Sequence, residues 1–216
     1  MADREDWNKR YAAKPLVWSA GPNQLLADTV STLMASGLGG RRAVDLACGE
    51  GRNAIWLAQQ GFSVTGIDYS ETGIAKARQI SRKRHAKVNW IVADLSTFEL
   101  EPGAYDLVTI VYLHTGADER DRWMTCAAAS VAPSGALVYI GHDPRNVSEG
   151  VGGPQDIDLL PTASQIGDYL EGFVVDRAEV VERPLVSDPG HGGQERGVDP
   201  ESLIALDTLM VARRSH

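Results

Sequence analysis

The sequence predicts an α/β domain built on a seven-stranded, mostly parallel sheet, with helices on both faces and an antiparallel hairpin at the C-terminal end. Three observations predict this fold. Short apolar runs alternate with helical patterns through the first two thirds of the chain. The first apolar run leads into a glycine-containing turn that a helix follows. The last two strand-like runs leave no room for a crossover helix, so they must pair antiparallel.

The individual elements follow from the apolar periodicity. Strand-like runs are expected at residues 43–47, 63–68, 88–93, 107–113 and 136–140. Helices are expected at residues 24–34, 52–60, 71–85 and 118–131. Ser70 and Asp118 are suitable N-caps for the last two of these helices. Apolar strands that alternate with helices indicate right-handed crossovers and a parallel sheet buried on both faces.

The C-terminal part departs from this alternation. Thr162 and Gln165 form a capping-box pattern, which predicts one more helix. Residues 173–186 and 202–213 both have strand character, and the linker at 187–200 is rich in Gly, Asp and Pro. We therefore expect a terminal hairpin whose linker is an ordinary solvent loop.

Length and composition exclude several classes of protein. One domain over residues 1–216 is expected for a chain of 216 residues without internal repeats. The net charge of −8 and the scattered basic residues argue against a nucleic-acid partner, and the basic group at 82–84 is expected on a solvated helix face. No apolar run is long enough to span a membrane, and the charged N-terminus lacks the apolar core of a signal peptide. Together with two cysteines expected to be reduced, Cys48 and Cys126, this predicts a cytoplasmic protein.

The segment 44–54 carries the strongest functional signal. Its apolar run contains a carboxylate, Asp45, and leads into a turn with Gly49 and Gly51. A buried carboxylate needs a partner, and a strand–glycine turn–helix unit brings backbone close to a nucleotide-like ligand. A second acid, Asp68, closes the next strand 23 residues after Asp45, where a ribose diol can be held.

Two ligands suit this unit. The spacing Gly49-x-Gly51-x-x-Ala54 also satisfies the dinucleotide fingerprint. A pyrophosphate on this turn would face the charge of Glu50, although Arg52 could offset part of it. A ligand that carries a sulfonium and an ammonium has no such conflict, and its cationic end would be the partner of Asp45. The charges therefore favour a cationic methyl donor.

Five segments extend this interpretation along the chain, at residues 45–51, 66–70, 93–95, 105–111 and 133–138. Over nearly the full length they resemble the motifs of the class I S-adenosylmethionine-dependent methyltransferases, which have a Rossmann-like sheet. The resemblance implies S-adenosyl-L-methionine as cofactor and S-adenosyl-L-homocysteine as product. It implies a helical cap over the cofactor at residues 1–40, a cofactor-binding core at 41–143, and a substrate loop, helix and hairpin at 144–216. The cofactor-binding residues that it implies are Arg10, Tyr11, Trp18, Asp45, Ala47, Gly49, Gly51, Asn53, Asp68, Tyr69, Ser70, Ala93, Asp94, Leu95 and Val111.

The N-terminal segment resembles one branch of that family. Its aromatic residues, together with Gly51–Ala54, look like the tellurite-resistance and thiopurine methyltransferase branch. In that branch an aromatic N-terminal segment closes over the cofactor, which implies that Tyr11 and Trp18 line the site and that Arg10 reaches the donor's carboxylate. The alternative is a plain helix that uses Trp7, Tyr11 and Trp18 as core.

Two histidines are candidates for a general base, because they follow the fourth and fifth strands at the edge where ligands bind in such sheets. His142 is the stronger candidate, and the adjacent Asp143 is expected to orient its ring. The alternative for this pair is an Asx turn before Pro144. His114 is a second candidate base or an acceptor contact, although a structural role suits it better. No His/Asp/Glu group has metal-ligand spacing on one element, so we expect no metal site.

The sequence leaves the acceptor open. The glycine-rich loop at 149–156 follows the fifth strand, so it is assigned to the acceptor site. The favoured function is O-methylation of a small hydroxylated acceptor, for example a carbohydrate, with a histidine base. The alternatives are S-, Se- or Te-methylation of a soft detoxification substrate, which needs no base, and a sensor that binds S-adenosylmethionine without turnover. Neither the methylated atom nor the choice between monomer and homodimer follows from the sequence.

Overall fold

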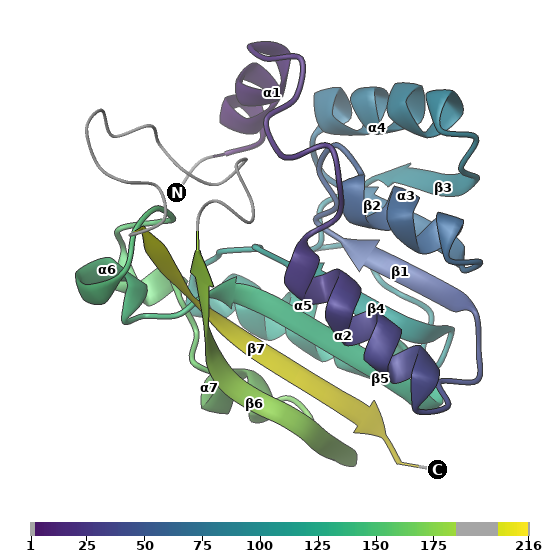
Figure 1. The fold of residues 1–216 in the computed structure, drawn as a ribbon, viewed down its shortest axis with the longest axis vertical. Helices are drawn as coiled ribbons and strands as arrows, with labels where there is room; N and C mark the ends of the chain where they lie inside the picture. Colours follow the sequence, from purple (N-terminus) through teal and green to yellow (C-terminus); the bar gives the residue numbers. More distant parts are fainter. Residues whose placement is uncertain (1–2, 185–202, 216) are drawn as a thin grey trace.

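A computed structural model describes residues 3–184 and 203–215 of the chain (Figure 1). Its centre is a seven-stranded sheet with the order β3-β2-β1-β4-β5-β7-β6. The strands are β1 (Arg42–Leu46), β2 (Ser63–Asp68), β3 (Val88–Val92), β4 (Tyr105–Val111), β5 (Val131–His142), β6 (Phe173–Pro184) and β7 (Ile204–Arg214). The first five are parallel, and β7 pairs antiparallel with both β5 and β6. The predicted fold class and terminal hairpin are confirmed.

The described helices follow the predicted order, with short additions near the C-terminus. They are α1 (Arg4–Ala12), α2 (Gln24–Ala35), α3 (Arg52–Gln59), α4 (Glu71–Lys83), α5 (Ala117–Ser130), α6 (Asn146–Glu149), the 3-10 helix η1 (Ile157–Leu159) and α7 (Ala163–Gly167). Ser70 caps α4 by accepting from the Gly73 amide, and Thr162 and Gln165 form the predicted capping box of α7.

Two local predictions are wrong. Asp118 does not cap its helix, because α5 begins one residue earlier and Gly116 takes the N-cap position. Asp118 lies instead in the first turn, where the positive end of the helix dipole stabilises its negative charge. The fifth strand begins at Val131, directly after α5, rather than at residue 136. The predicted solvent loop at 187–200 lies outside the described residues.

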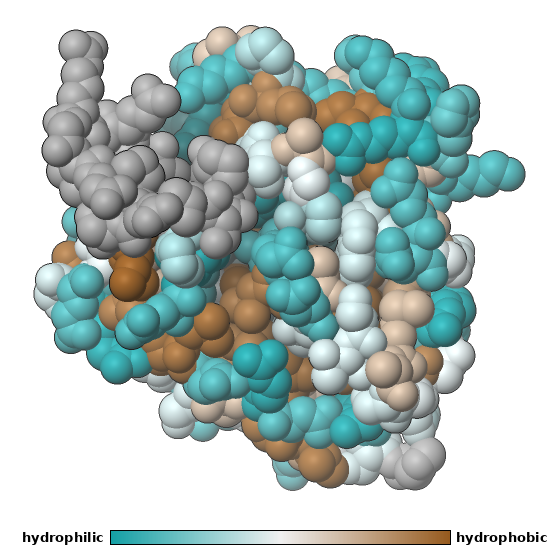
Figure 2. Space-filling view, viewed as in Figure 1, coloured by the Kyte–Doolittle hydropathy of each residue, from teal (hydrophilic) through white to brown (hydrophobic). Residues whose placement is uncertain are grey.

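Two apolar cores cover the two faces of the sheet. Side chains of α5 and α7, such as Met124 and Ile166, pack with Val108, Leu137 and Tyr139 on one face. The other face is covered by α2 and α3, whose apolar side chains pack with alternate residues of the same strands. The parallel strands therefore have both faces buried, as their continuous apolar sequences require. Figure 2 shows that the outer surface around α4 is mostly hydrophilic, and the basic residues Arg82 and Lys83 are exposed there as predicted.

The sheet topology sets the position of the site. All five parallel strands end at the same edge, so the segments that follow β1, β2, β3, β4 and β5 lie close together there. The hairpin reaches the same edge because His142 at the end of β5 is paired with Asp207 of β7. No helix in the described part of the chain is long and apolar enough to cross a bilayer.

Candidate functional site

The glycine turn after β1 is built from left-handed backbone. Ala47, Gly49 and Gly51 have φ values of 55°, 55° and 81°, and Gly51 serves as the N-cap of α3. A side chain at position 49 would lie 2.5 Å from the hydroxyl oxygen of Tyr11, so both the backbone angle and the close approach of Tyr11 require glycine. The turn thus presents bare backbone at the carboxyl edge of the sheet.

Asp45 lies buried directly beneath this turn. Its carboxylate accepts hydrogen bonds from the Thr109 hydroxyl at 2.9 Å and the Ala54 amide at 3.1 Å. Burial raises its pKa to about 7, although these two hydrogen bonds and the charge of Arg52 offset part of the rise. A buried carboxylate needs a partner, and the sequence predicts that the ligand provides it. In the structure the protein itself supplies two hydrogen-bond donors, Thr109 and Ala54, which sequence reasoning missed. A neighbouring cation would favour the ionised form further.

The expected role of Glu50 needs correction. Its carboxylate is 3% exposed and accepts from Lys76 Nζ at 2.9 Å and from the amides of Val17 and Trp18 at 2.9 and 3.3 Å. The Glu50 charge is therefore paired and directed at the N-terminal segment. It does not repel an anion bound on the turn, and the preference for a cationic donor cannot rest on it.

Asp68 ends β2 with both carboxylate oxygens engaged. One oxygen accepts from the Gly49 amide and the other from the Ser70 amide, each at 2.8 Å. Burial raises the pKa of Asp68, and these amide bonds offset part of the rise. Asp68 therefore joins the glycine turn of β1 to the start of α4. Tyr69 follows it, half-buried, and the Ser70 hydroxyl donates to Asn8 of α1 at 2.6 Å.

The segment after β3 comes to the same edge. Ala93, Asp94 and Leu95 are half-buried, and the Ala93 amide donates to the Asp68 carbonyl at 3.1 Å. Asp94 accepts from the amide and hydroxyl of Ser96, which lower its pKa. Among the other predicted residues, Asn53 accepts from the buried Asn23 amide at 2.9 Å, and Val111 is buried at the end of β4.

The N-terminal segment packs its aromatic residues over the turn. Tyr11 is buried, accepts from Trp18 Nε1 at 3.4 Å, and lies close to both Gly49 and Gly73. Arg10 is exposed and stacks on the rings of Trp7 and Trp18 at 4.9 and 5.3 Å. Tyr11 thus combines the two alternatives from the sequence, since it is packed as core and also borders the glycine turn.

A second cluster surrounds His142, which is 2% exposed. Its Nδ1 lies 3.1 Å from Oδ1 of Asp207, within ion-pair distance. The expectation that Asp143 orients this ring is wrong. Successive strand residues point to opposite faces, and Asp143 binds the Thr208 hydroxyl and Arg145 instead.

Asp207 has two further partners that sequence reasoning missed. The Tyr112 hydroxyl and the Arg183 guanidinium Nε both donate to its Oδ2 at 2.6 Å. Burial alone would raise the pKa of Asp207, but His142 and Arg183 outweigh it and hold that pKa below its usual range. The available signal was an aspartate inside the apolar run of residues 204–211, the same signal that marked Asp45.

His114 and a glycine complete this cluster. The His114 ring stacks on that of His142, with centroids 5.3 Å apart and planes 11° apart, and its Nε2 accepts from the His142 amide at 3.2 Å. A side chain at Gly153 would lie 2.4 Å from Cδ2 and 2.7 Å from Nε2 of His142. The loop at 149–156 therefore packs directly on the imidazole.

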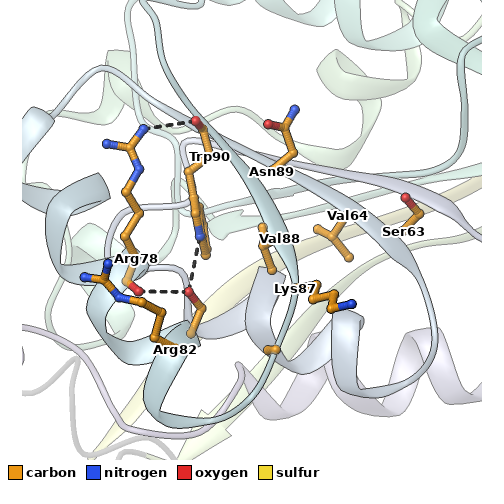
Figure 3. A pocket seen from close by; sticks show the side chains of 10 residues that line it. Ser63, Val64, Arg78, Arg82, Lys87, Val88, Asn89 and Trp90 are labelled. Atoms are coloured by element: carbon orange, nitrogen blue, oxygen red, sulfur yellow. Dashed lines mark hydrogen bonds between the residues drawn. The ribbon is translucent and has the colours of Figure 1, made fainter.

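A shallow hollow of about 470 Å³ lies at the opposite edge, between the starts of β2 and β3 and the end of α4 (Figure 3). There Arg78 donates to the Trp90 carbonyl and Trp90 Nε1 donates to Ser81. Over residues 3–184 and 203–215, no group of three or more His, Cys, Asp or Glu side chains is placed to hold a metal ion.

Comparison with known sequences gives this arrangement a context. Residues 43–135 match a family model described as a methyltransferase domain. The ubiquinone biosynthesis O-methyltransferase of Pseudomonas aeruginosa is 31% identical over 176 residues, which cover 79% of this chain and 70% of that enzyme. The protein of the same name from Coxiella burnetii is 28% identical over 102 residues, which cover 47% of this chain and only 44% of the relative. The chain thus spans less than half the length of that relative.

Solved structures share the fold. A protein from Pyrococcus horikoshii superposes with a TM-score of 0.65 at 19% identity, covering 96% of this chain and 99% of that one. TehB of Haemophilus influenzae has a TM-score of 0.64 at 14% identity, covering 86% and 62%. Magnesium protoporphyrin IX methyltransferase of Synechocystis, solved with S-adenosylmethionine bound, has a TM-score of 0.59 at 22% identity, covering 89% and 79%. These likenesses establish the Rossmann-like architecture.

Proposed function

Since this chain belongs to the class I S-adenosylmethionine-dependent methyltransferases, we propose that it methylates a hydroxyl group of a small acceptor, with His142 as the general base. The observation that carries the proposal is the His142–Asp207 pair at the carboxyl edge of β5. A buried carboxylate at Nδ1 fixes the tautomer that leaves Nε2 as the proton acceptor. O-methylation is also the activity in the names of the two relatives.

The residues at the glycine turn fit the methyl donor. The carboxylate of Asp68 suits ribose hydroxyls, and residues 93–95 follow at the next strand, where an adenine would lie. Asp45, with its pKa raised to about 7, lies beneath the turn where a cationic ligand would stabilise its ionised form. Tyr11 lies over Gly49 and so borders the donor's position. On this proposal the N-terminal segment covers the donor, and Trp18 lines the same space.

The donor supplies an activated methyl group on a sulfonium. The protein must then align the acceptor oxygen with that methyl, exclude water and remove a proton. A hydroxyl is too weakly acidic to attack unaided near neutral pH, so His142 Nε2 takes the proton as the oxygen attacks. Asp207 stabilises the imidazolium that forms, while Tyr112 and Arg183 hold Asp207 in place.

A second candidate is methylation of a thiolate, selenide or telluride, which requires no base. Its support is the likeness to TehB in fold, together with the resemblance of the N-terminal sequence to the tellurite-resistance and thiopurine methyltransferase branch. The oriented histidine favours the hydroxyl acceptor, because a buried His–Asp pair at the reaction edge has no task in transfer to a soft anion. A sensor without turnover is the third alternative, and it likewise leaves the pair unused.

Turnover with a panel of hydroxylated, thiol and carboxylic acceptors tests the proposal. S-adenosylhomocysteine release is measured for the wild type, for His142→Gln, and for His85→Asn as a control at an exposed histidine at the end of α4. We expect hydroxyl methylation in the wild type, a loss of about 100-fold or more in His142→Gln, and no change in the control. The proposal is wrong if the wild type methylates none of the hydroxylated acceptors, or if His142→Gln keeps full activity.

A further inference from the structure

The hollow at the edge where β2 and β3 begin has a basic lining, and we refer to it as the basic hollow. Its volume of about 470 Å³ lies within the range of small-molecule sites. Figure 3 shows Arg78 and Arg82 on the α4 side of this hollow and Lys87 across from them. Ser63 and Asn89 add polar groups from the starts of β2 and β3, and no described residue of the lining is acidic. Three segments of the chain therefore direct positive charge and hydrogen-bond donors to one place.

The protein does not neutralise these cations. Within residues 3–184 and 203–215, none of the three lining cations forms an ion pair, whereas Arg42 and Lys76 each pair with a carboxylate at 2.9 Å. Arg78 Nη2 donates to the Trp90 carbonyl at 3.2 Å. This bond to a neutral group orients the guanidinium beside the hollow but does not balance its charge.

The basic charge is concentrated in one short segment. Residues 76–87 hold six of the 21 Lys and Arg residues and no Asp or Glu, in a chain whose net charge is −8. The dipole of α4 stabilises the cations of its last turn, Arg82 and Lys83. It does not account for Arg78, which precedes that turn, or for Lys87, which follows the helix by four residues. An anion in the basic hollow would stabilise all three lining cations at once.

The end of α4 leaves the cationic groups available to a ligand. The carbonyls of Ile80 and Ser81 accept from the amides of Arg84 and Ala86, each at 3.0 Å, so the backbone satisfies them. The side chains of Arg82 and Lys87 are exposed. An anion can therefore reach them without displacing a helix contact.

The size of the hollow and the charge of the whole chain limit the kind of anion. A nucleic acid would extend beyond the hollow and meet the net negative charge of the remaining surface. A compact polyanion stays within reach of the three cations. Guanidinium and ammonium groups form charge-assisted hydrogen bonds to phosphate oxygens, and arginine can bind them in bidentate fashion.

We propose that the basic hollow binds the diphosphate or triphosphate group of a small molecule through Arg78, Arg82 and Lys87. The hollow lies where the parallel strands begin, whereas Asp68 and His142 lie at the opposite edge, where these strands end. The phosphate compound is therefore an accessory ligand and not the methyl acceptor. This inference is independent of the proposed O-methylation.

Calorimetric titration with pyrophosphate, with and without saturating S-adenosylhomocysteine, tests the site. We expect a dissociation constant of about 1 mM or tighter at about 50 mM salt, with the same affinity in both titrations. Arg82→Gln/Lys87→Gln should bind pyrophosphate about tenfold or more weakly. The matched control Lys83→Gln/Arg84→Gln removes the same charge from the same segment outside the lining, so its affinity should fall less than about threefold.

Three results would overturn the proposal. Absent pyrophosphate binding, or equal losses in the two double variants, would show that the hollow is no specific site. Binding that S-adenosylhomocysteine abolishes would place the anion at the glycine turn. Tighter binding of a single-stranded oligonucleotide than of pyrophosphate would make the partner a nucleic acid.

A second variant places a carboxylate in the lining. Asn89 is exposed, so Asn89→Asp should fold and should weaken pyrophosphate binding about fivefold or more through repulsion. Gln79→Glu, at an exposed position of α4 outside the lining, is its control and should change the affinity less than about twofold. Equal affinity of these two variants would also count against the basic hollow as the site.

Discussion

His142 Nδ1 and Asp207 Oδ1 lie 3.1 Å apart across the antiparallel pair formed by β5 and β7. The two residues are 65 positions apart in the chain and meet because the last strand returns beside the fifth. The appended hairpin therefore contributes to the chemistry of the edge as well as closing the sheet. Through Asp207 it also brings Arg183 and Tyr112 to the same place.

Removing the charge of Asp207 should impair the positioning of the His142 ring without weakening the binding of the cofactor. We expect Asp207→Asn to lower the methylation rate by about 10²- to 10⁴-fold, because the imidazole loses its orienting carboxylate, while the affinity for S-adenosylhomocysteine stays within about twofold. The pH–rate profile should also change, since the imidazolium is no longer stabilised. An unchanged rate and profile would show that Asp207 has only a structural role.

The same variant makes a prediction about acid stability. The pKa of Asp207 is lowered in the folded state, so its contribution to stability is present above the unfolded pKa of about 4 and is lost as the pH falls through the folded value. Asp207→Asn should therefore unfold with a smaller loss of stability below pH ~4 than the wild type. It should be less stable at pH 7 by about 3 kcal/mol, since Arg183 then lacks its anion. Chemical denaturation at pH 3 to 8 measures both effects.

Asp45 should behave in the opposite way. Its folded-state pKa is raised to about 7, so the folded protein holds an extra proton between pH ~4 and 7, and stability falls as the pH rises through that range. A cationic donor should release this proton on binding. We expect calorimetry at pH 6 in buffers of different ionisation enthalpy to show proton release on S-adenosylmethionine binding, and Asp45→Asn to abolish it. Binding without proton exchange would place the donor's cation away from Asp45.

Asp68 should control donor affinity. Asp68→Asn keeps a carbonyl acceptor for one amide but loses the charge and the second acceptor. We expect S-adenosylhomocysteine to bind about tenfold or more weakly, while Asp106→Asn at the far edge of the sheet leaves its affinity unchanged. If Asp68→Asn and Asp106→Asn bind S-adenosylhomocysteine equally well, the assignment of the ribose to Asp68 is wrong.

The glycine that packs on His142 offers a steric test. In Gly153→Ala the new Cβ would lie 2.4 Å from the ring at a φ of 72°, so the imidazole must move. We expect a loss of methylation of about 10-fold or more without loss of donor affinity. Gly172→Ala, at a φ of 78° with open space around it, controls for backbone strain. Equal activity in the two variants would remove the loop at 149–156 from the acceptor site.

The sequence was sufficient for the fold because the signals are local. Apolar runs, caps such as Ser70 and the short distance between the last two strands each constrain topology without knowledge of long-range contacts. The errors arose where a choice between near neighbours depends on context. Asp118 is a good capping residue, but helix α5 starts at Ala117, so Gly116 takes the N-cap position.

Partners of the site residues were harder to predict than the residues themselves. Asp143 is adjacent to His142 in sequence, but strand geometry turns it to the opposite face, and the register of β7 supplies Asp207 instead. Likewise, the sequence predicts that the Glu50 charge opposes a pyrophosphate on the turn, whereas in the structure Lys76 and the amide of Val17 bind that carboxylate. Tertiary register decides both cases, and neither local pattern nor composition carries that information.

The central claim is that His142 removes a proton from a hydroxyl acceptor. Its most direct test takes one hydroxyl acceptor that the wild type methylates and the thiol analogue of that acceptor. Single-turnover kinetics at pH 7.5 measure the methylation of both compounds by the wild type and by His142→Gln. The account predicts a loss of about 100-fold or more for the hydroxyl and less than about threefold for the thiol, because a thiolate needs no base. Equal losses for both acceptors, or none for the hydroxyl, would contradict it.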